Sequence, residues 1–196
     1  MIARKELRRQ IFHLVSGVVM ALLVYAGILN KISMGVLVLA AAIISFVSRR
    51  VKIPGIYWFL SRFDRDPDLV KFPGKGALFY VVGAYIAVLI FASDIAAASI
   101  VILALGDSVS HIIGRFGSIK HPFSDLKYFE GSIAGVIAAF IGSFIILQSA
   151  IQAGLASMIA MLTEGFNLEL GGKKIDDNLL LPVVAGTVIW LVRIFI

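Results

Sequence analysis

Seven blocks of mostly apolar residues, each roughly 15 to 20 residues long, are the feature that most constrains this fold. They cover residues 11–29, 33–48, 76–93, 95–114, 131–148, 150–164 and 179–196. A helix needs about 20 apolar residues to cross a bilayer, whereas a strand of a membrane barrel needs about ten of alternating polarity. The blocks therefore predict an all-α, polytopic integral membrane bundle with about seven transmembrane helices.

The composition supports this class. Of the 196 residues, 60% are hydrophobic and 15% are charged, whereas soluble domains have about 45–50% apolar and about 25% charged residues. An ordinary soluble domain is therefore excluded. The spans use nearly all of the chain, so we expect a single transmembrane domain over residues 1–196. The first block follows a basic start, but no small-residue cleavage site stands out, and we expect a retained helix rather than a signal peptide.

The interval from 131 to 164 is compatible with two interpretations. It is short for two full crossings, and one kinked helix with an interfacial tail is the alternative. The polar pair Gln148-Ser149 and the nearby Gln152 interrupt the apolar run. These residues favour two helices, and with them a topology of seven spans rather than six.

Basic residues indicate the orientation of the seven-span chain. Of the 18 Lys and Arg residues, only Lys31 and Arg193 fall on one side of the predicted membrane. Cytoplasmic loops carry the excess of Lys and Arg, so we expect a cytoplasmic N-terminus and an external C-terminus. Topology and attraction to anionic headgroups can explain most of these charges. The same basic face would also concentrate nucleotides or phosphorylated lipids.

An acidic residue lies inside the fourth block. Asp107 occurs in ILALGDSVSHIIGRFG, and a carboxylate inside a span is costly and usually marks a functional site. On a helix it shares a face with His111 and Gly114. Asp107 could hold a hard divalent cation. The alternative is that Asp107 pairs with His or Arg of a neighbouring helix only for packing.

The loop after this block carries further ionisable residues. Lys120, Lys127 and Glu130 occur in SIKHPFSDLKYFEGSIAG, just before the fifth block. We expect Asp107 and Glu130 to bind Mg²⁺ together, with Arg115 and the two lysines neutralising phosphate oxygens. Glu130 also lies where a helix dipole favours a carboxylate, so capping is its alternative role.

A third acidic cluster lies late in the chain. Glu164 ends the sixth block, and Asp176, Asp177 and Asn178 directly precede the seventh. The last three can be a helix N-cap, with Pro182 near the first turn. In the seven-span topology they share a face with Asp107, where they are suited to a second metal ligand or a proton acceptor.

Two segments alternate basic and aromatic residues, ELRRQIFH and IYWFLSRFDRDPDLVKFPGKGALFY. Such segments lie in the headgroup layer, and simple anchoring is the alternative to a site. We expect Arg9, His13 and Arg62 to contact a lipid substrate, although His13 has the alternative of a satisfied polar residue within its span. Lys75 lies in PGKG, a turn by composition and alone a weak phosphate-binding signal.

The order of these motifs resembles the CTP-dependent lipid kinase family, which includes dolichol kinase, phytol kinase and yeast-type diacylglycerol kinase. The motifs are ELRRQIFHLVSG, FPGKGALFY, LGDSVSHIIGRFG, KYFEGSIAG, and TEG followed by DDNLLLP. The resemblance covers nearly the whole chain. It implies an enzyme that transfers the γ-phosphate of CTP to the hydroxyl of a membrane isoprenoid alcohol or diacylglycerol.

The resemblance also implies a site on the cytoplasmic face. CTP and Mg²⁺ would be bound by Asp107, Arg115, Lys120, Lys127 and Glu130, with Lys75, Ser108, His111, Gly114 and Asn178 as further nucleotide contacts. One of Glu164, Asp176 and Asp177 would accept the proton. The expected partners are CTP and a membrane lipid, and no nucleic acid.

Two alternatives remain. The stretch from Asp107 to Gly131 also resembles phosphatidate cytidylyltransferase, in which a lipid phosphate attacks the α-phosphate of CTP. This chain lacks that family's C-terminal Lys-Asp element and its His-Gly-Gly followed by Asp-Arg, so the kinase is favoured. A small ion-coupled transporter would also carry intramembrane acids. In a transporter we would expect acidic residues along a path through the bilayer, whereas the acidic residues of this chain gather toward one face.

Overall fold

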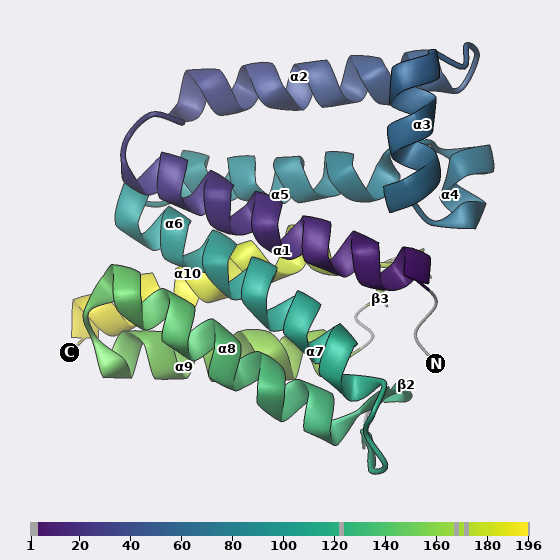
Figure 1. Cartoon of the computed structure of the whole chain (residues 1–196). Coiled ribbons are helices and arrows are strands. Elements are labelled where there is room, and N and C mark those ends of the chain that lie inside the picture. Colours follow the sequence, from purple (N-terminus) through teal and green to yellow (C-terminus); the bar gives the residue numbers. More distant parts are fainter. Residues whose placement is uncertain (1–3, 122–123, 167–168, 171–172, 196) are drawn as a thin grey trace.

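Long helices lying side by side make up most of the computed structural model, which describes residues 4–121, 124–166, 169–170 and 173–195 (Figure 1). Each predicted apolar block forms a helix. These are α1 (Arg4–Tyr25), α2 (Lys31–Ser48), α5 (Lys75–Ile90), the continuous run α6 (Ser93–Val101), η1 (Ile102–Asp107) and α7 (Ser108–Gly114), then α8 (Phe129–Leu147), α9 (Ala150–Gly165) and α10 (Asp177–Phe195).

Five of these helices are long and apolar enough to cross a membrane: α1, α2, the run Ser93–Gly114, α8 and α10. Helix α5 is also apolar but has 16 residues, and α9 has 16 as well. Many large apolar side chains on the outer faces are exposed, among them Ile32, Val36 and Leu39 of α2. Exposing so much apolar surface to water is energetically unfavourable, so the chain is a polytopic, all-helical integral membrane protein.

Residues 131–164 form two helices, so the alternative of one kinked helix is wrong. Helix α8 ends where Gln148 adopts a left-handed conformation with φ of 52°. Ser149 then caps α9, and its side chain accepts a hydrogen bond from the Gln152 amide. The polar residues that interrupt the apolar run therefore form the turn of a helical hairpin.

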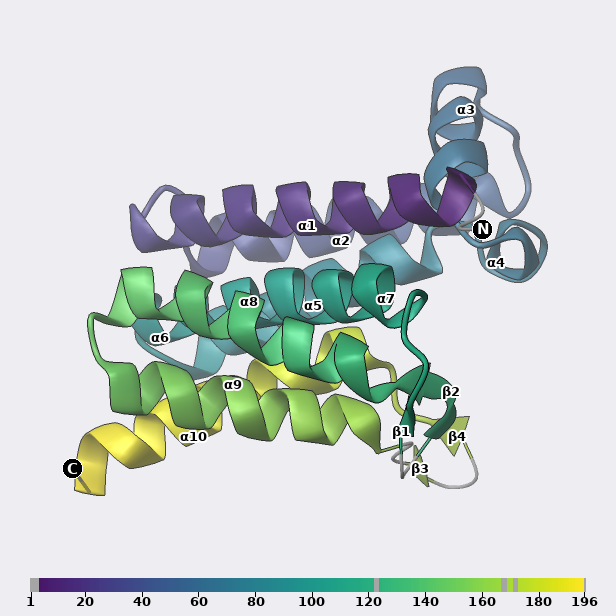
Figure 2. The ribbon, with the colours of Figure 1, turned by 60° about the horizontal axis from the view of Figure 1, so that its bottom comes forward.

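Shorter elements gather at one end of the bundle. They are α3 (Pro54–Phe63), α4 (Asp66–Lys71), and two antiparallel hairpins, β1 (Lys120–His121) with β2 (Ser124–Tyr128) and β3 (Glu169–Leu170) with β4 (Lys173–Lys174). Figures 1 and 2 show α3 lying across the direction of the long helices, with the C-terminus at the opposite end. Both α3 and α4 begin with Pro in the first turn, where its missing amide costs nothing.

Helix α6 forms the centre of the bundle. It packs against α1, α5, α8 and α10, and its residues Ile95 to Val101 are all buried. Small residues let its continuation approach α8 closely. A Cβ on Gly131 would lie 2.6 Å from the Gly114 Cα, and one on Gly135 would lie 2.8 Å from the Gly106 carbonyl oxygen. The close crossing fixes α7 against the start of α8.

A π-helical turn interrupts this central helix. The turn η1 covers Ile102–Asp107, directly between α6 and α7. Turns of this kind insert one extra residue into a helix and are frequent at functional sites. The turn ends at Asp107, so this carboxylate lies at the irregularity of the candidate span with the largest buried share.

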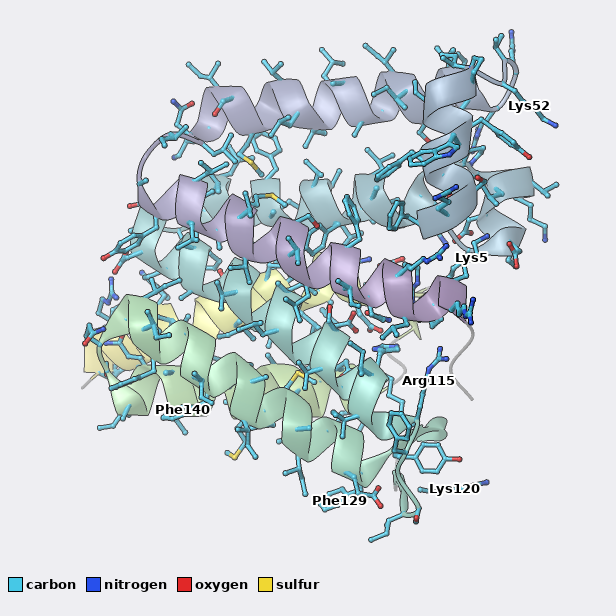
Figure 3. The ribbon with its side chains drawn as sticks, viewed as in Figure 1. Lys5, Lys52, Arg115, Lys120, Phe129 and Phe140 are labelled. Carbon is cyan, nitrogen blue, oxygen red and sulfur yellow. The ribbon has the colours of Figure 1, made fainter. Side chains whose placement is uncertain are left out.

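Basic residues gather at the end that carries α3 and the hairpins. Figure 3 shows Lys5, Lys52, Arg115 and Lys120 at this end. Lys31 begins α2 and Arg193 lies in the last turn of α10, both at the opposite end. We call the first end the basic end.

Candidate active site

A cavity of about 660 Å³ opens at the basic end. It is lined by α1, α3, the first turns of α5, the Asp107–Arg115 segment, the end of β2, Glu164 of α9 and the start of α10. One wall is apolar and includes Phe12, Phe59 and Phe63. The lining also includes Asp107, His111 and Glu164. The cavity therefore combines apolar aromatic rings with ionisable side chains.

Asp107, His111 and Glu164 form the polar centre of this cavity. His111 Nδ1 lies 3.2 Å from Asp107 Oδ1 and 2.9 Å from the Asp107 carbonyl oxygen. The same nitrogen lies 4.0 Å from Glu164 Oε1. One ligand atom from each residue lies within 4.8 Å of the others. Such a group can hold a metal ion.

Lys127 joins this centre from the hairpin. Its Nζ lies 2.5 Å from Glu164 Oε1 and 2.6 Å from the Glu164 carbonyl oxygen. Ser110 Oγ also donates to Glu164 Oε1, at 3.4 Å. Glu164 is completely buried, and its Oε2 has no hydrogen-bond partner among the described residues. A buried carboxylate needs a compensating charge, which Lys127 supplies to one oxygen only.

His13 faces Asp107 from α1. Its Nε2 is buried, lies 4.0 Å from Asp107 Oδ2, and has no hydrogen-bond partner among the described residues. The imidazole packs on the Tyr80 ring with 3.9 Å between centroids. Tyr80 reaches this position because Gly17 leaves room, since a Cβ there would overlap the phenol oxygen. His13 is thus held with one nitrogen available beside the acidic centre.

Two arginines at the cavity share one carboxylate. Arg9 Nη2 lies 2.6 Å from Glu6 Oε1, and Arg115 Nη2 lies 3.5 Å from the same oxygen. The buried Gln10 side chain also donates to Glu6, at 3.0 Å. Arg9 and Arg115 line the cavity. Glu6 was not predicted as a site residue, because its only signal in the sequence is its position as an acid within an otherwise basic N-terminal segment.

Asp64 shapes the turn that carries Lys75. Its carboxylate accepts hydrogen bonds from the amides of Gly74, at 2.7 Å, and Arg65, at 3.0 Å. Burial raises the pKa of the Asp64 carboxyl, and these two amides partly oppose that rise. Gly74 has φ of 76°, a conformation that favours glycine. Lys75 then begins α5 and lines the cavity. Asp64 was also missed.

The late acidic cluster both caps a helix and lines the cavity. Asp176 Oδ1 accepts from the Asn178 amide at 3.1 Å, and the Asp176 carbonyl accepts from the Leu179 amide at 3.0 Å. Asp176, Asp177 and Asn178 all line the cavity, as does Gly114. Capping of α10 and a contribution to the site, the two roles considered from the sequence, are therefore compatible.

Four predicted site residues lie outside the lining found in the described part of the chain: Glu130, Lys120, Ser108 and Arg62. The Glu130 carboxylate accepts from the Ser118 amide at 2.7 Å and from the Ile119 amide at 3.1 Å. The Arg62 guanidinium lies 4.2 Å from the Trp58 ring centroid. Lys120 is exposed, at the outer edge of the molecule (Figure 3), and Ser108 is buried. The structure thus brings Glu164, rather than Glu130, next to Asp107.

Several known proteins are similar to this chain in sequence. An uncharacterised protein of Methanocaldococcus jannaschii is 34% identical over 193 residues, covering 94% of this chain and 93% of the relative. A probable phytol kinase of rice is 33% identical over 118 residues, covering 59% of this chain and 34% of the kinase. The CTP-dependent diacylglycerol kinase 1 of Schizosaccharomyces pombe is 26% identical over 131 residues, covering 60% of each protein. The chain is thus related to phytol kinases and to a CTP-dependent diacylglycerol kinase, at modest identity over part of its length.

The resemblance of the motifs to this lipid kinase family is thereby confirmed. The chain spans between about a third and two thirds of the length of the kinases it matches. No family model matches the chain, and no solved structure matches it.

Proposed function

We propose that this protein is a lipid kinase that transfers the γ-phosphate of CTP to a membrane alcohol. The acceptor is an isoprenoid alcohol of the dolichol, polyprenol or phytol type, or diacylglycerol. The single observation that carries the proposal is one cavity that joins an aromatic wall to buried carboxylates and basic side chains. Sequence similarity to phytol kinases and to a CTP-dependent diacylglycerol kinase supports the same activity.

The acidic centre fits Mg²⁺. Asp107 and Glu164 offer two carboxylates close together, and Glu164 Oε2 lacks a hydrogen-bond partner among the described residues. Mg²⁺ is usually bound by one or two carboxylates together with substrate phosphates. Asp107 and Glu164 would therefore hold the ion, which when bound neutralises charge on the transferred phosphate. In this proposal Glu130 stabilises the loop before α8 instead.

Basic side chains around the same cavity would neutralise the triphosphate. Arg9 and Arg115 lie together on one side, Lys75 begins α5, and Lys127 lies at the acidic centre. Phosphoryl transfer depends mainly on positioning and charge stabilisation, which such side chains provide. His111 is held by Asp107 and orients that carboxylate.

In the proposed phosphoryl transfer, the acceptor oxygen attacks the γ-phosphorus and forms a new O–P bond. The bond from that phosphorus to the oxygen bridging to the β-phosphate breaks, and CDP leaves with the electron pair. The hydroxyl proton passes to a carboxylate of the late cluster, Asp176 or Asp177, since Glu164 is already bound by Lys127.

We further propose that all seven long helices cross the bilayer with the basic end in the cytoplasm. The lopsided distribution of Lys and Arg supports this orientation. The short α5 and α9 are compatible with it, because local thinning of the bilayer accommodates short spans. The cavity would then open where CTP is available.

Product analysis tests the reaction type. Purified protein in lipid nanodiscs is incubated with Mg²⁺, CTP and either a lipid alcohol, which is a long-chain prenol or diacylglycerol, or, in a parallel sample, a lipid phosphate. The phosphorus species are followed by ³¹P NMR. A lipid phosphomonoester and CDP in equal amounts are expected. Pyrophosphate release from a lipid phosphate would instead indicate a cytidylyltransferase, and no turnover with any acceptor would contradict the proposal.

A further inference from the structure

Three aromatic rings separate the cavity from the outside of the bundle. Phe12 of α1 lies 5.1 Å from Phe59 and 4.9 Å from Phe63 of α3, measured between ring centroids. Phe59 and Phe63 lie 4.8 Å apart. All three rings line the cavity. They form its wall where α1 meets α3.

A shallow apolar groove lies on the outer side of this wall. It is lined by Arg8, Ile11, Phe12, Val15 and Phe63, and its volume is about 280 Å³. Phe12 and Phe63 therefore line both the cavity and the groove. Because each of these two rings borders both spaces, a change of rotamer can open a passage between the cavity and the groove.

The exposed side of the groove lies on a candidate membrane-spanning helix. Ile11 and Val15 are 49% and 52% exposed, and both lie on α1, which is long and apolar enough to span the membrane. Arg8 lies one turn nearer the basic end, on the same face of this helix. The groove thus runs from a cationic end into an apolar surface.

Helix α3 lies across the long helices beside this groove (Figure 1). Trp58 stacks under the Arg62 guanidinium, a pairing suited to the boundary between headgroups and hydrocarbon. The entrance would therefore lie at the depth where the hydroxyl of a membrane alcohol resides. An acceptor can reach the cavity from the side without its hydrocarbon chain crossing water.

We propose that the gap between α1 and α3 is the lateral entrance for the acceptor lipid, with Phe12 and Phe63 as its gate. The hydrocarbon chain of the acceptor lies along Ile11 and Val15, and its hydroxyl lies inside the cavity. This inference rests on the proposed lipid kinase function. It assigns the groove to the acceptor itself rather than to bulk phospholipid.

Photo-crosslinking tests the occupant directly. The full chain in nanodiscs is irradiated with a long-chain alcohol bearing a diazirine on its chain, and adducts are mapped by mass spectrometry. Adducts are expected between residues 8 and 15 and at Phe63, reduced at least tenfold by excess unlabelled alcohol. Adducts that excess alcohol does not displace would mean bulk lipid, and adducts only elsewhere would also overturn the inference.

Blocking the groove from outside gives a kinetic test. Val15→Trp should raise KM for a long-chain alcohol at least fivefold more than KM for a short, water-soluble alcohol. The matched control is Val36→Trp, which changes a similarly exposed valine on α2. Equal effects of the two variants would contradict the entrance. Thermal unfolding of both variants identifies any loss of folding.

The two experiments separate the entrance from the proposed function. If the adducts are displaceable but the protein has no kinase activity, the lipid-binding groove is supported and the proposed function is contradicted. If the protein is an active kinase but the adducts lie elsewhere and Val15→Trp has no selective effect, the entrance is contradicted and the proposed function is supported.

Discussion

The Lys127 ammonium stabilises the buried carboxylate of Glu164. Its Nζ contacts both the carboxylate and the carbonyl of Glu164, which is completely buried. Removing one partner of a buried pair leaves an uncompensated charge and costs about 3–5 kcal/mol. We expect Lys127→Met to lower the free energy of unfolding by this order and to abolish transfer.

The double variant Lys127→Met, Glu164→Met is the control. Because neither charge remains, it should recover most of the stability and none of the activity. Chemical unfolding in detergent measures the first and lipid phosphorylation the second. Unchanged stability of the single variant would show that the pair is not formed.

Glu6 is expected to act through the two arginines that it holds. Glu6→Gln removes the carboxylate between Arg9 and Arg115. If the arginines bind the triphosphate, KM for CTP should rise by about fivefold, corresponding to about 1 kcal/mol, with little change in kcat. Glu6→Asp should recover part of the loss.

Asp66→Asn provides the comparison for Glu6. It breaks an ion pair with Lys5 near the same end, but its carboxylate is 83% exposed. Exposed pairs contribute little, so this variant should keep the wild-type KM. If Glu6→Gln also keeps the wild-type KM for CTP, Glu6 does not position the two arginines.

At the scale of elements, the close crossing of α7 and α8 makes a glycine essential. A Cβ on Gly131 would lie 2.6 Å from both the Gly114 Cα and the Ser110 carbonyl oxygen. Gly131→Ala should therefore destabilise the fold by about 1–3 kcal/mol and lower activity, since Ser110 and Gly114 line the cavity.

Gly154 on α9 is the matched position for this test. A Cβ there would lie 3.9 Å from the nearest Phe140 ring atoms, an ordinary contact. Gly154→Ala should keep the melting temperature within a few degrees of wild type. Equal melting temperatures for the two alanine variants would contradict the tight crossing.

The helices were predictable because apolar periodicity and length are local properties of the sequence. The polar break at Gln148 also marked the α8–α9 turn correctly. The π-turn before Asp107 has no comparable local signature, and neither has the crosswise placement of α3. Glu130 was predicted to bind Mg²⁺ with Asp107 because it lies, with Lys120 and Lys127, in the loop that follows the block containing Asp107. In the fold Lys127 reaches Glu164, 37 residues away, while Glu130 binds loop amides.

For the whole molecule, the orientation has a direct test, because the chain contains no cysteine. Lys31→Cys and Lys52→Cys place single thiols at opposite ends, both at exposed residues. With the basic end in the cytoplasm, a membrane-impermeant maleimide should label Lys31→Cys in intact cells. Lys52→Cys should react only after permeabilisation. The reverse pattern would place the cavity outside the cell.

The most direct measurement of the central claim compares phosphate transfer from CTP labelled at either the γ- or the α-phosphate. Wild-type protein, Asp107→Asn, Glu164→Gln and Glu130→Gln are each incubated with Mg²⁺ and an acceptor lipid, and organic-phase label is counted. The account predicts label from the γ-position only, retained in Glu130→Gln and lost in the other two variants. Label from the α-position, or full γ-transfer by Asp107→Asn and Glu164→Gln, would contradict it.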